Sequence, residues 1–392
     1  MTTIQGVKLD GSEPVAPVIP RDIQTEEMVF NMGPQHPSTH GVLRVTVKTD
    51  GEAVLDCHPL VGNLHRCAEK IIESLTYVQG LPYVDRMDYL GALNNEMGIA
   101  LAVEKAAGIE VPKRAQYLRV ILCEINRVIS HLFSAGQLGL DMGAFTPFLY
   151  MFREREEGIK LLNEVTGGRL LYHYIRYGGV TRDVTADWCS KVKMYCDVVD
   201  GHLDEYNNLL TYNHIFLNRT CGVAVIDKET CLEYAATGPI LRAAGVKRDL
   251  RKDIPYSSYE DFDFEVPAGP FEHGVVGDSW SRHRQRLYEI EQSTRIIRQA
   301  IDHLPDGDIQ HPKVTRAWKA PAGEAYVASE TPRGEIAFYF VSDGGKTPYR
   351  MKARGPSFNN ISLLGECARG LLIGDLIALI GSVDITLGEV DR

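Results

Sequence analysis

The chain has 392 residues, 44% of them hydrophobic and 24% charged, which is an ordinary composition for a globular protein with one large core or two domains. Its formal net charge of -10 argues against a nucleic-acid-binding protein, because contacts with phosphates need a surplus of Lys and Arg. The most apolar stretch, residues 371–385, is interrupted by two Gly and two Asp, so it is shorter than the ~20 apolar residues of a membrane span. Residues 1–20 lack the apolar segment of a signal peptide.

Both ends of the chain predict small β elements. Residues 1–26 contain three prolines and predict an extended arm. Residues 27–65 predict a small sheet, because a strand-like run is followed by alternating residues on both sides of an Asp-Gly hairpin turn. Its turn-rich segment, residues 33–41, carries His36 and His40 at one end of the sheet.

Residues 66–330 predict a central helical bundle, because their apolar residues recur with a period of 3.6. Expected helices cover 67–79, 87–107, a segment after Pro112, a segment after Thr146, 185–212, a short segment capped by Asp227, and 281–304. Residues 331–392 predict a hairpin (335–341 and 349–353), a helix at 360–372 and a tail that packs on the bundle. The predicted fold class is α+β, mainly α.

The two histidines of the turn-rich segment are the first candidate site. Histidines four residues apart form a metal site when they lie on a helix, but Pro37 lies between His36 and His40 and no third ligand is evident. A turn in which one His caps backbone groups is the favoured structural interpretation. The eight cysteines form no C-x-x-C pair, and most are expected to be small buried hydrophobic residues.

Two further segments gather polar residues between apolar ones. Residues 82–89 (PYVDRMDY) place Arg86 and Tyr89 at a junction between a loop and a helix, where acidic residues also simply favour a helix N-terminus. Asp141 lies between two apolar helices, so we expect it to be partly buried and to need a partner. A His on a nearby loop would serve, and such a pair sets the pKa of a catalytic His.

Eight segments in order resemble one family: NMGPQHPSTHGVLR (31–44), GNLHRCAEK (62–70), PYVDRMDY (82–89), DMGAFTP (141–147), FRERE (152–156), DLRK (249–252), PSFNN (356–360) and GEVDR (388–392). Each segment alone is weak evidence of a relationship. The ordered set, however, is similar to the 49 kDa-type subunit of respiratory complex I, the proton-pumping NADH:quinone oxidoreductase. Cys67 stands where the family usually has Gly. The resemblance implies a fold like that of the large subunit of [NiFe] hydrogenases.

The same resemblance bears on metal binding. Hydrogenases hold nickel with two C-x-x-C pairs, whose positions correspond here to Asp88, Gly91, Thr386 and Glu389. Because no thiolate is present, we expect soft-metal binding there to be lost. This disfavours the alternative that the chain is the large subunit of a membrane-bound energy-converting hydrogenase. A non-catalytic scaffold is a third alternative.

The resemblance implies a quinone-binding catalytic subunit, in which quinone is reduced to quinol and the reaction is coupled to proton translocation. It places His40 and Tyr89 on either side of the quinone headgroup, with His36 in the same site and Asp141 paired with His40.

The resemblance also implies a neighbouring cluster and a location. Arg66 and Arg86 would approach a [4Fe–4S] cluster in a small Fe–S partner subunit, and this chain would bind no cofactor of its own. Other implied partners are the 30 kDa-type and membrane-arm subunits, on the cytoplasmic side of a bacterial inner membrane. Many members have a His just after the position of Arg169, where this chain has Leu171. Either His173 replaces that His, or the potential of the cluster is independent of pH.

Overall fold

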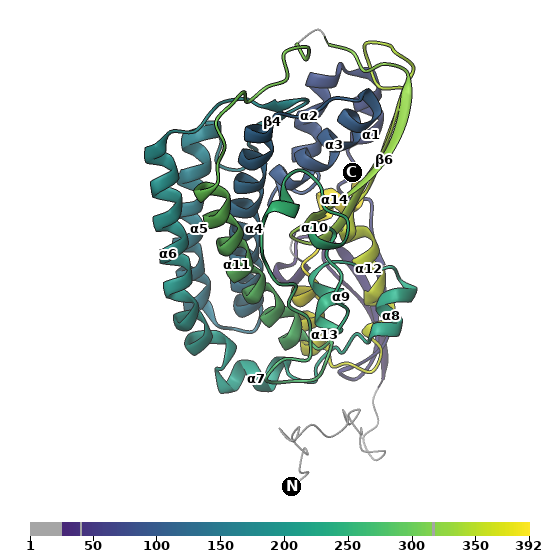
Figure 1. The fold of residues 1–392 in the computed structure, drawn as a ribbon. Helices are drawn as coiled ribbons and strands as arrows, with labels where there is room; N and C mark the ends of the chain where they lie inside the picture. The colour runs from purple at the N-terminus through teal and green to yellow at the C-terminus, as the bar shows by residue number, and fades with distance from the viewer. Residues whose placement is uncertain (1–25, 40, 316–317) are drawn as a thin grey trace.

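A computed structural model describes residues 26–39, 41–315 and 318–392 (Figure 1). Of the expected N-terminal arm, all but Glu26 lies outside these residues, and so does His40. The helices are α1 (Ala68–Ser74), α2 (Tyr77–Asp85), α3 (Ala92–Ala107), α4 (Lys113–Asp141), α5 (Phe145–Thr166), α6 (Ala186–Tyr206), α7 (His214–Thr220), α8 (Lys228–Glu233), α9 (Pro239–Ala243), α10 (Leu250–Asp253), α11 (Ser279–Asp302), α12 (Pro356–Cys367), α13 (Ile373–Val383) and α14 (Leu387–Asp391). Short 3-10 or π turns are η1 (Pro37–Thr39), η2 (Asn207–Thr211) and η3 (Tyr259–Asp261).

The strands form three small antiparallel sheets, so the predicted α+β, mainly α, fold class is confirmed. They are β1 (Glu27–Met32), β2 (Arg44–Asp50) and β3 (Ala53–Leu60); β4 (Ile175–Arg176) and β5 (Gly179–Val180); and β6 (Gly323–Thr331), β7 (Gly334–Ser342) and β8 (Arg350–Arg354). No helix within the described ranges is long and apolar enough to cross a membrane.

The long helices α4, α5, α6 and α11 lie alongside one another and form the bundle on the left of Figure 1. Small residues let them approach closely. A Cβ atom on Gly158 of α5 would lie 2.9 Å from Ile129 of α4 and 2.6 Å from the Tyr195 hydroxyl of α6. A larger side chain there would push the three helices apart.

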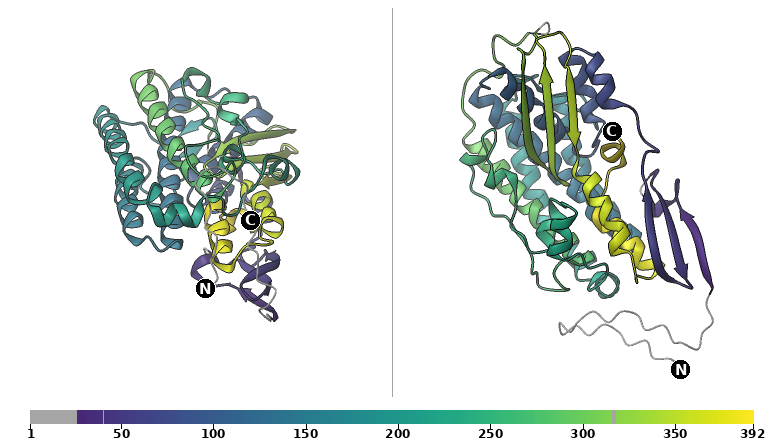
Figure 2. Two further views of the ribbon diagram at one scale, coloured as in Figure 1. Left: turned by 90° about the horizontal axis from the view of Figure 1, so that it is seen from below. Right: turned by 90° about the vertical axis from the view of Figure 1, so that its right-hand side faces the viewer.

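The sheet β6–β8 covers α3 at the other side of the bundle (Figures 1 and 2). A Cβ atom on Gly98 of α3 would lie 2.8 Å from the ring of Phe338 in β7, so helix and sheet are in direct contact. Strand β6 starts at Gly323, within the range where the sequence predicts bundle. Its Ala, Glu and Ser residues have low strand propensity, and pairing with β7 decides its conformation.

The two ends of the chain share a second hydrophobic core. The N-terminal sheet lies beside α12 and α13, which come from the last part of the chain (Figure 2). Val54 of β3 donates its N–H to the Leu371 carbonyl (2.8 Å) and accepts from Gly370 (2.8 Å). The two segments are thus joined by backbone hydrogen bonds as well as by apolar contacts.

A network of buried ion pairs crosses the interior between the bundle and β6. Arg242 of α9 is fully buried and donates to Glu289 of α11 (2.8 Å) and to Glu330 of β6 (2.8 Å). Arg251 of α10 pairs with Glu124 of α4 (3.0 Å). Burial acts to raise the pKa of Glu124, but the neighbouring guanidinium groups lower it to about 2, so this carboxylate is charged.

The sequence places most helices correctly but misses some boundaries. The helix expected at 67–79 is two helices, because Thr76 forms a capping box with Gln79 and starts α2. The helix expected from 87 starts at Ala92, and residues 86–91 form a turn. Asp227 caps a helix as predicted, with a side-chain hydrogen bond from Thr230 N. Thr185, where the sequence predicts the start of a helix, caps α6 by accepting a hydrogen bond from Trp188 N. Thr146 lies inside the first turn of α5, which starts at Phe145 after Ala144.

We predict that Arg242→Met lowers the free energy of unfolding by about 3–5 kcal/mol, because it leaves Glu289 and Glu330 buried without their cation. Thermal unfolding followed by circular dichroism measures the change. The matched control is Lys160→Met, which breaks an exposed pair with Glu157 and should leave the midpoint unchanged. Equal midpoints for both variants would contradict the importance of the buried network.

Candidate functional site

The turn between α2 and α3, residues 86–91, presents Tyr89. Helix α2 ends at Asp85, and Gly91 precedes the first turn of α3. Asn126 of α4 fixes the turn, since its side-chain amide donates to the Leu90 carbonyl (2.8 Å). The Tyr89 side chain is 37% exposed, and its partial burial raises the pKa of its hydroxyl. Tyr89 is therefore a protonated hydrogen-bond donor at neutral pH, carried on an anchored turn.

Directly before Tyr89, Asp88 is fully buried and holds a charge cluster together. The Arg333 guanidinium donates to both Asp88 oxygens (3.1 and 2.9 Å) and, through its other terminal nitrogen, to Asp384 (3.1 Å). Arg333 lies in the turn between β6 and β7, and Asp384 follows α13. One guanidinium group therefore joins three segments that are distant in the sequence.

The four positions that the sequence resemblance matches to hydrogenase nickel ligands lie together at this cluster. The Thr386 hydroxyl lies 3.3 Å from Asp88 Oδ1, and a Cβ atom on Gly91 would lie 2.6 Å from Asp88 Oδ2. Glu389 accepts a hydrogen bond from the Ser357 N–H (3.0 Å), and burial followed by the charge of Asp88 raises the pKa of Glu389 to about 7. Within the described ranges, no group of three or more His, Cys, Asp or Glu side chains is placed to hold a metal ion.

Asp141, at the end of α4, faces α13. Its Oδ1 accepts from the Gln137 amide (3.1 Å), and a Cβ atom on Gly381 would lie only 2.7 Å from its Oδ2. Gly381 therefore lets α13 approach the carboxylate. Because Asp384 follows the same helix, Asp141 and the Asp88 cluster both lie at the C-terminal end of α13.

The turn-rich N-terminal segment packs on the same region. The turn η1 contacts α13, and a Cβ atom on Gly41 would lie 3.9 Å from Leu387 of α14. His36 is exposed, and its Nδ1 accepts from the Ser38 N–H (3.2 Å), which is the backbone-capping role that the sequence favours for this turn. Its assignment to the headgroup site remains a prediction.

The two candidate arginines lie together at the start of the Tyr89 turn. Arg66 donates from its side chain to the Arg86 carbonyl (2.6 Å) and from its backbone to the Arg392 carbonyl (3.1 Å). Arg86 donates to the Pro82 carbonyl (2.7 Å). Both side chains are exposed, so two guanidinium groups are available on this surface to a partner with negative charge.

His173 does not carry a charge in this environment. Burial and the nearby Arg176 and Arg86 lower the pKa of its imidazole to about 4, and the ring contacts the Arg176 guanidinium. His173 is consequently neutral at physiological pH, so it is poorly suited to replace a His that takes up a proton.

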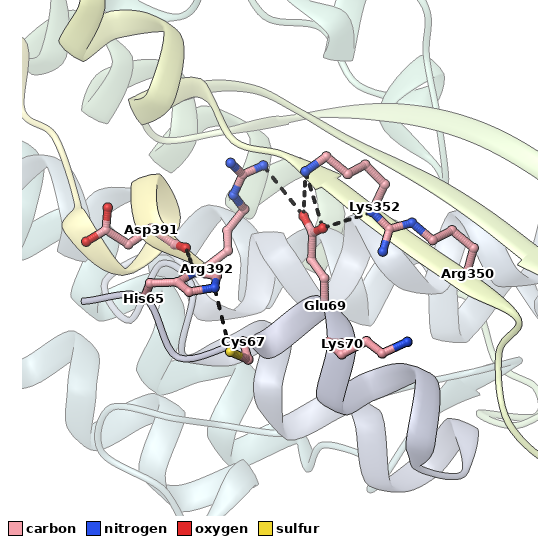
Figure 3. Close-up of a pocket in the computed structure, with 8 residues that line it drawn as sticks. All are labelled: His65, Cys67, Glu69, Lys70, Arg350, Lys352, Asp391 and Arg392. Carbon is pink, nitrogen blue, oxygen red and sulfur yellow. Dashed lines mark hydrogen bonds and ion pairs between the residues drawn. The ribbon is translucent and has the colours of Figure 1, made fainter. Parts of the chain in front are cut away.

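An open pocket of ≈ 260 Å³ lies next to Arg66 (Figure 3). Six of its eight lining residues are acidic or basic: Glu69, Lys70, Arg350, Lys352, Asp391 and Arg392. Figure 3 shows Lys352 and Arg350 directed at Glu69, with the shortest Lys352 contact at 3.0 Å. Pockets for small organic ligands are mostly apolar, so this pocket is unsuited to a quinone headgroup.

Comparison with known proteins identifies the family. The family model described as respiratory-chain NADH dehydrogenase, 49 Kd subunit, matches residues 141–316 and 309–392. The chain belongs to this family. It is 50% identical over 369 residues to the D subunit of the NADH-quinone oxidoreductase of Bacillus anthracis, covering 94% of this chain and 100% of the relative. The D subunit of the Chlorobium luteolum enzyme is 47% identical over 378 residues, covering 96% of both chains.

These comparisons confirm the family resemblance seen in the sequence, and the chain is a subunit of an oxidoreductase complex. Three residues of the candidate site had no local signal in the sequence: Arg333, Asp384 and Gly381. Each acts through a contact with a segment far away in the chain, so neither spacing nor hydrophobic period marks it.

We predict that Glu389→Gln removes a pH dependence of stability. The folded protein keeps a proton on Glu389 up to about pH 7, whereas the ordinary pKa of a Glu is 4.5. The contribution of Glu389 to the free energy of unfolding is therefore complete below about pH 4.5, and it falls by about 2–3 kcal/mol as the pH rises to 7. The unfolding temperature of this chain in the purified complex, measured across this range, should fall less steeply in the variant. Parallel curves for both proteins would contradict the prediction.

Proposed function

We propose that this subunit binds quinone at the Tyr89 turn and reduces it to quinol, together with a small partner subunit that holds a [4Fe–4S] cluster. The observation that carries the proposal is the position of Tyr89, a partly exposed phenol beside the buried Asp88–Arg333–Asp384 cluster, where the resemblance matches the nickel-ligand positions of hydrogenases. Family membership supports it, because the relatives are named as D subunits of NADH-quinone oxidoreductases.

The chemistry requires donors near the quinone oxygens. Reduction adds two electrons and two protons, and negative charge builds on the two carbonyl oxygens before the protons arrive. The Tyr89 hydroxyl stabilises that charge on one side, and His40, with an ordinary pKa of ~6.5, donates on the other. Tyr89 is the weaker acid, since partial burial raises its pKa further. His36 is the secondary candidate in the same site.

Asp141 is proposed as the partner of His40. A carboxylate behind an imidazole orients the ring and raises its pKa, so that His40 holds a proton until the reduced quinone takes it. Asp141 then loses a charged partner in a poorly solvated place, which is costly. Movement of Asp141 against α13 is a route by which quinone reduction is coupled to proton translocation.

Arg66 and Arg86 are proposed to face the partner's cluster. Their exposed guanidinium groups lie at the start of the Tyr89 turn, and fixed positive charge favours a reduced cluster. The proposed partners are this small Fe–S subunit, the 30 kDa-type subunit and the membrane-arm subunits, on the cytoplasmic side of a bacterial inner membrane. The chain itself is proposed to hold no cofactor.

The energy-converting hydrogenase is the weaker alternative. It needs soft thiolate ligands for nickel, and Asp88, Gly91, Thr386 and Glu389 supply none. The cationic Arg333 also lies against Asp88, where a metal cation would be repelled.

We predict that Tyr89→Phe lowers quinone reductase activity of the assembled membrane complex by about 10²-fold, since it removes one preorganised donor to the developing charge. Oxidation of NADH by an artificial acceptor, which does not need the quinone site, should be unchanged. A double variant that also changes His40 should lose the remaining quinone activity. Unchanged quinone reduction in both variants would support the scaffold alternative.

We predict that Gly381→Ala lowers quinone reductase activity several-fold, because the new methyl group would lie 2.7 Å from Asp141 Oδ2 and displace the carboxylate. The matched control is Gly201→Ala in α6, where an added Cβ atom meets nothing within 4 Å. Steady-state rates in membranes, normalised to the artificial-acceptor rate, compare the two. Equal rates would exclude a role for Asp141 that depends on its position.

A further inference from the structure

Two acidic side chains face each other at the base of the Tyr89 turn. Asp85 is the last residue of α2, and Glu96 lies in α3, so they lie on either side of residues 86–91. Both side chains are 0% exposed. Glu96 Oε2 accepts from the backbone N–H groups of Tyr174 (3.0 Å) and Ile175 (2.7 Å).

The remaining three carboxyl oxygens of the two residues have no hydrogen-bond donor in the part of the chain that the structure describes. The Asp85 and Glu96 carboxyl groups are instead neighbours that interact with each other, and the backbone of His173 also lies beside both. Two carboxylates accept but do not donate, so a hydrogen bond between them needs one proton on the pair. Buried carboxyl groups that share a site retain such a proton, because two adjacent charges repel and neither is solvated.

The surroundings favour one negative charge on the pair. Arg86, at the end of α2, and Arg176, in β4, are the cations that face it. The other titratable neighbours are His173 and Tyr172, from the segment before β4, and Cys123 of α4. These three are neutral at physiological pH: burial lowers the pKa of His173 to about 4, and raises the pKa of Tyr172 to about 12 and that of the Cys123 thiol.

The same two helices hold the Tyr89 turn by other, uncharged contacts. The Asn95 amide of α3 donates to the Val84 carbonyl of α2 (3.4 Å). That hydrogen bond and the one from Asn126 to the Leu90 carbonyl do not depend on pH. The contact between the Asp85 and Glu96 carboxyl groups does depend on pH. The carboxyl pair is thus the titratable link between the two ends of the turn.

We propose that Asp85 and Glu96 share one proton, and that this shared proton positions the turn carrying Tyr89 for quinone reduction. They are positioning residues: they act through Tyr89 and do not touch the quinone. Loss of the proton places two charges side by side and separates the ends of α2 and α3, which displaces the phenol. The inference rests on the proposed function for the effect on catalysis, but the shared proton can be detected without it.

The experiment compares Glu96→Gln with Glu96→Ala in the assembled membrane complex. A Gln amide accepts from Tyr174 and Ile175 through its oxygen and donates to Asp85 through its nitrogen, so it reproduces the singly protonated pair at every pH. Glu96→Gln should keep quinone reduction within about twofold of the wild type at neutral pH and move the alkaline loss of activity up by about one pH unit or more. Glu96→Ala should lower kcat by about tenfold or more at all pH values, since the turn is misplaced.

Two control variants and one spectroscopic measurement separate failure of this inference from failure of the proposed function. Glu104 is a buried carboxylate of the same helix, and it is ion-paired with Arg119. Glu104→Gln should therefore leave the pH at which activity is lost on the alkaline side unchanged. Infrared difference spectra between neutral and alkaline pH should contain a carboxylic acid C=O band that disappears in Glu96→Gln. Tyr89→Phe is measured in the same series.

The outcomes distinguish the two proposals. If Glu96→Gln has the wild-type pH profile, or lacks activity as Glu96→Ala does, the inference is overturned. If the infrared band is the same in wild type and Glu96→Gln, the shared proton is likewise excluded. If Tyr89→Phe reduces quinone as fast as the wild type, the proposed function fails, and the infrared band alone then decides whether the pair shares a proton.

Discussion

The candidate site depends on the ion pairs that the Arg333 guanidinium forms with Asp88 and Asp384. The guanidinium binds both carboxylates at once, and all three side chains lie in the interior. Taking a charge out of water is costly unless another charge and good hydrogen bonds compensate it, so these groups can be buried only together. The turn carrying Tyr89, the β6–β7 turn and the end of α13 are consequently fixed by one electrostatic requirement.

Much of the fold could be predicted from the sequence because it follows from local chemistry. Thr185 and Asp227 cap helices by hydrogen bonds that span only three residues. The 3.6-residue period of the apolar residues likewise predicts the long helices of the bundle, because this period is a local property of the sequence. Strand β6 could not be predicted, since its residues have no strong strand preference and its conformation is decided by pairing with β7. The division of α1 from α2 was missed although the Thr76 capping box is a local pattern.

The candidate site was predictable only in part, and the family resemblance contributed most of it. Tyr89, Arg66 and Arg86 lie in one region, and Asp141 faces α13 close to it. The residues that hold them there, such as Arg333 and Asn126, could not be found by spacing, because their partners lie in distant segments. His40 lies outside the described residues, so its pairing with Asp141 remains a prediction.

The second hydrophobic core has a consequence for how the protein is made. Its N-terminal sheet packs on α12 and α13, and Asp88 and Thr386 in the site are separated by 298 positions. A ribosome releases the chain from its N-terminus at about 5–20 residues per second, so the sheet emerges well before the helices that cover it. The apolar face of β2 and β3 is therefore uncovered during most of translation. A chaperone or an assembly partner that covers this face transiently would protect the nascent chain from aggregation until the C-terminal helices arrive.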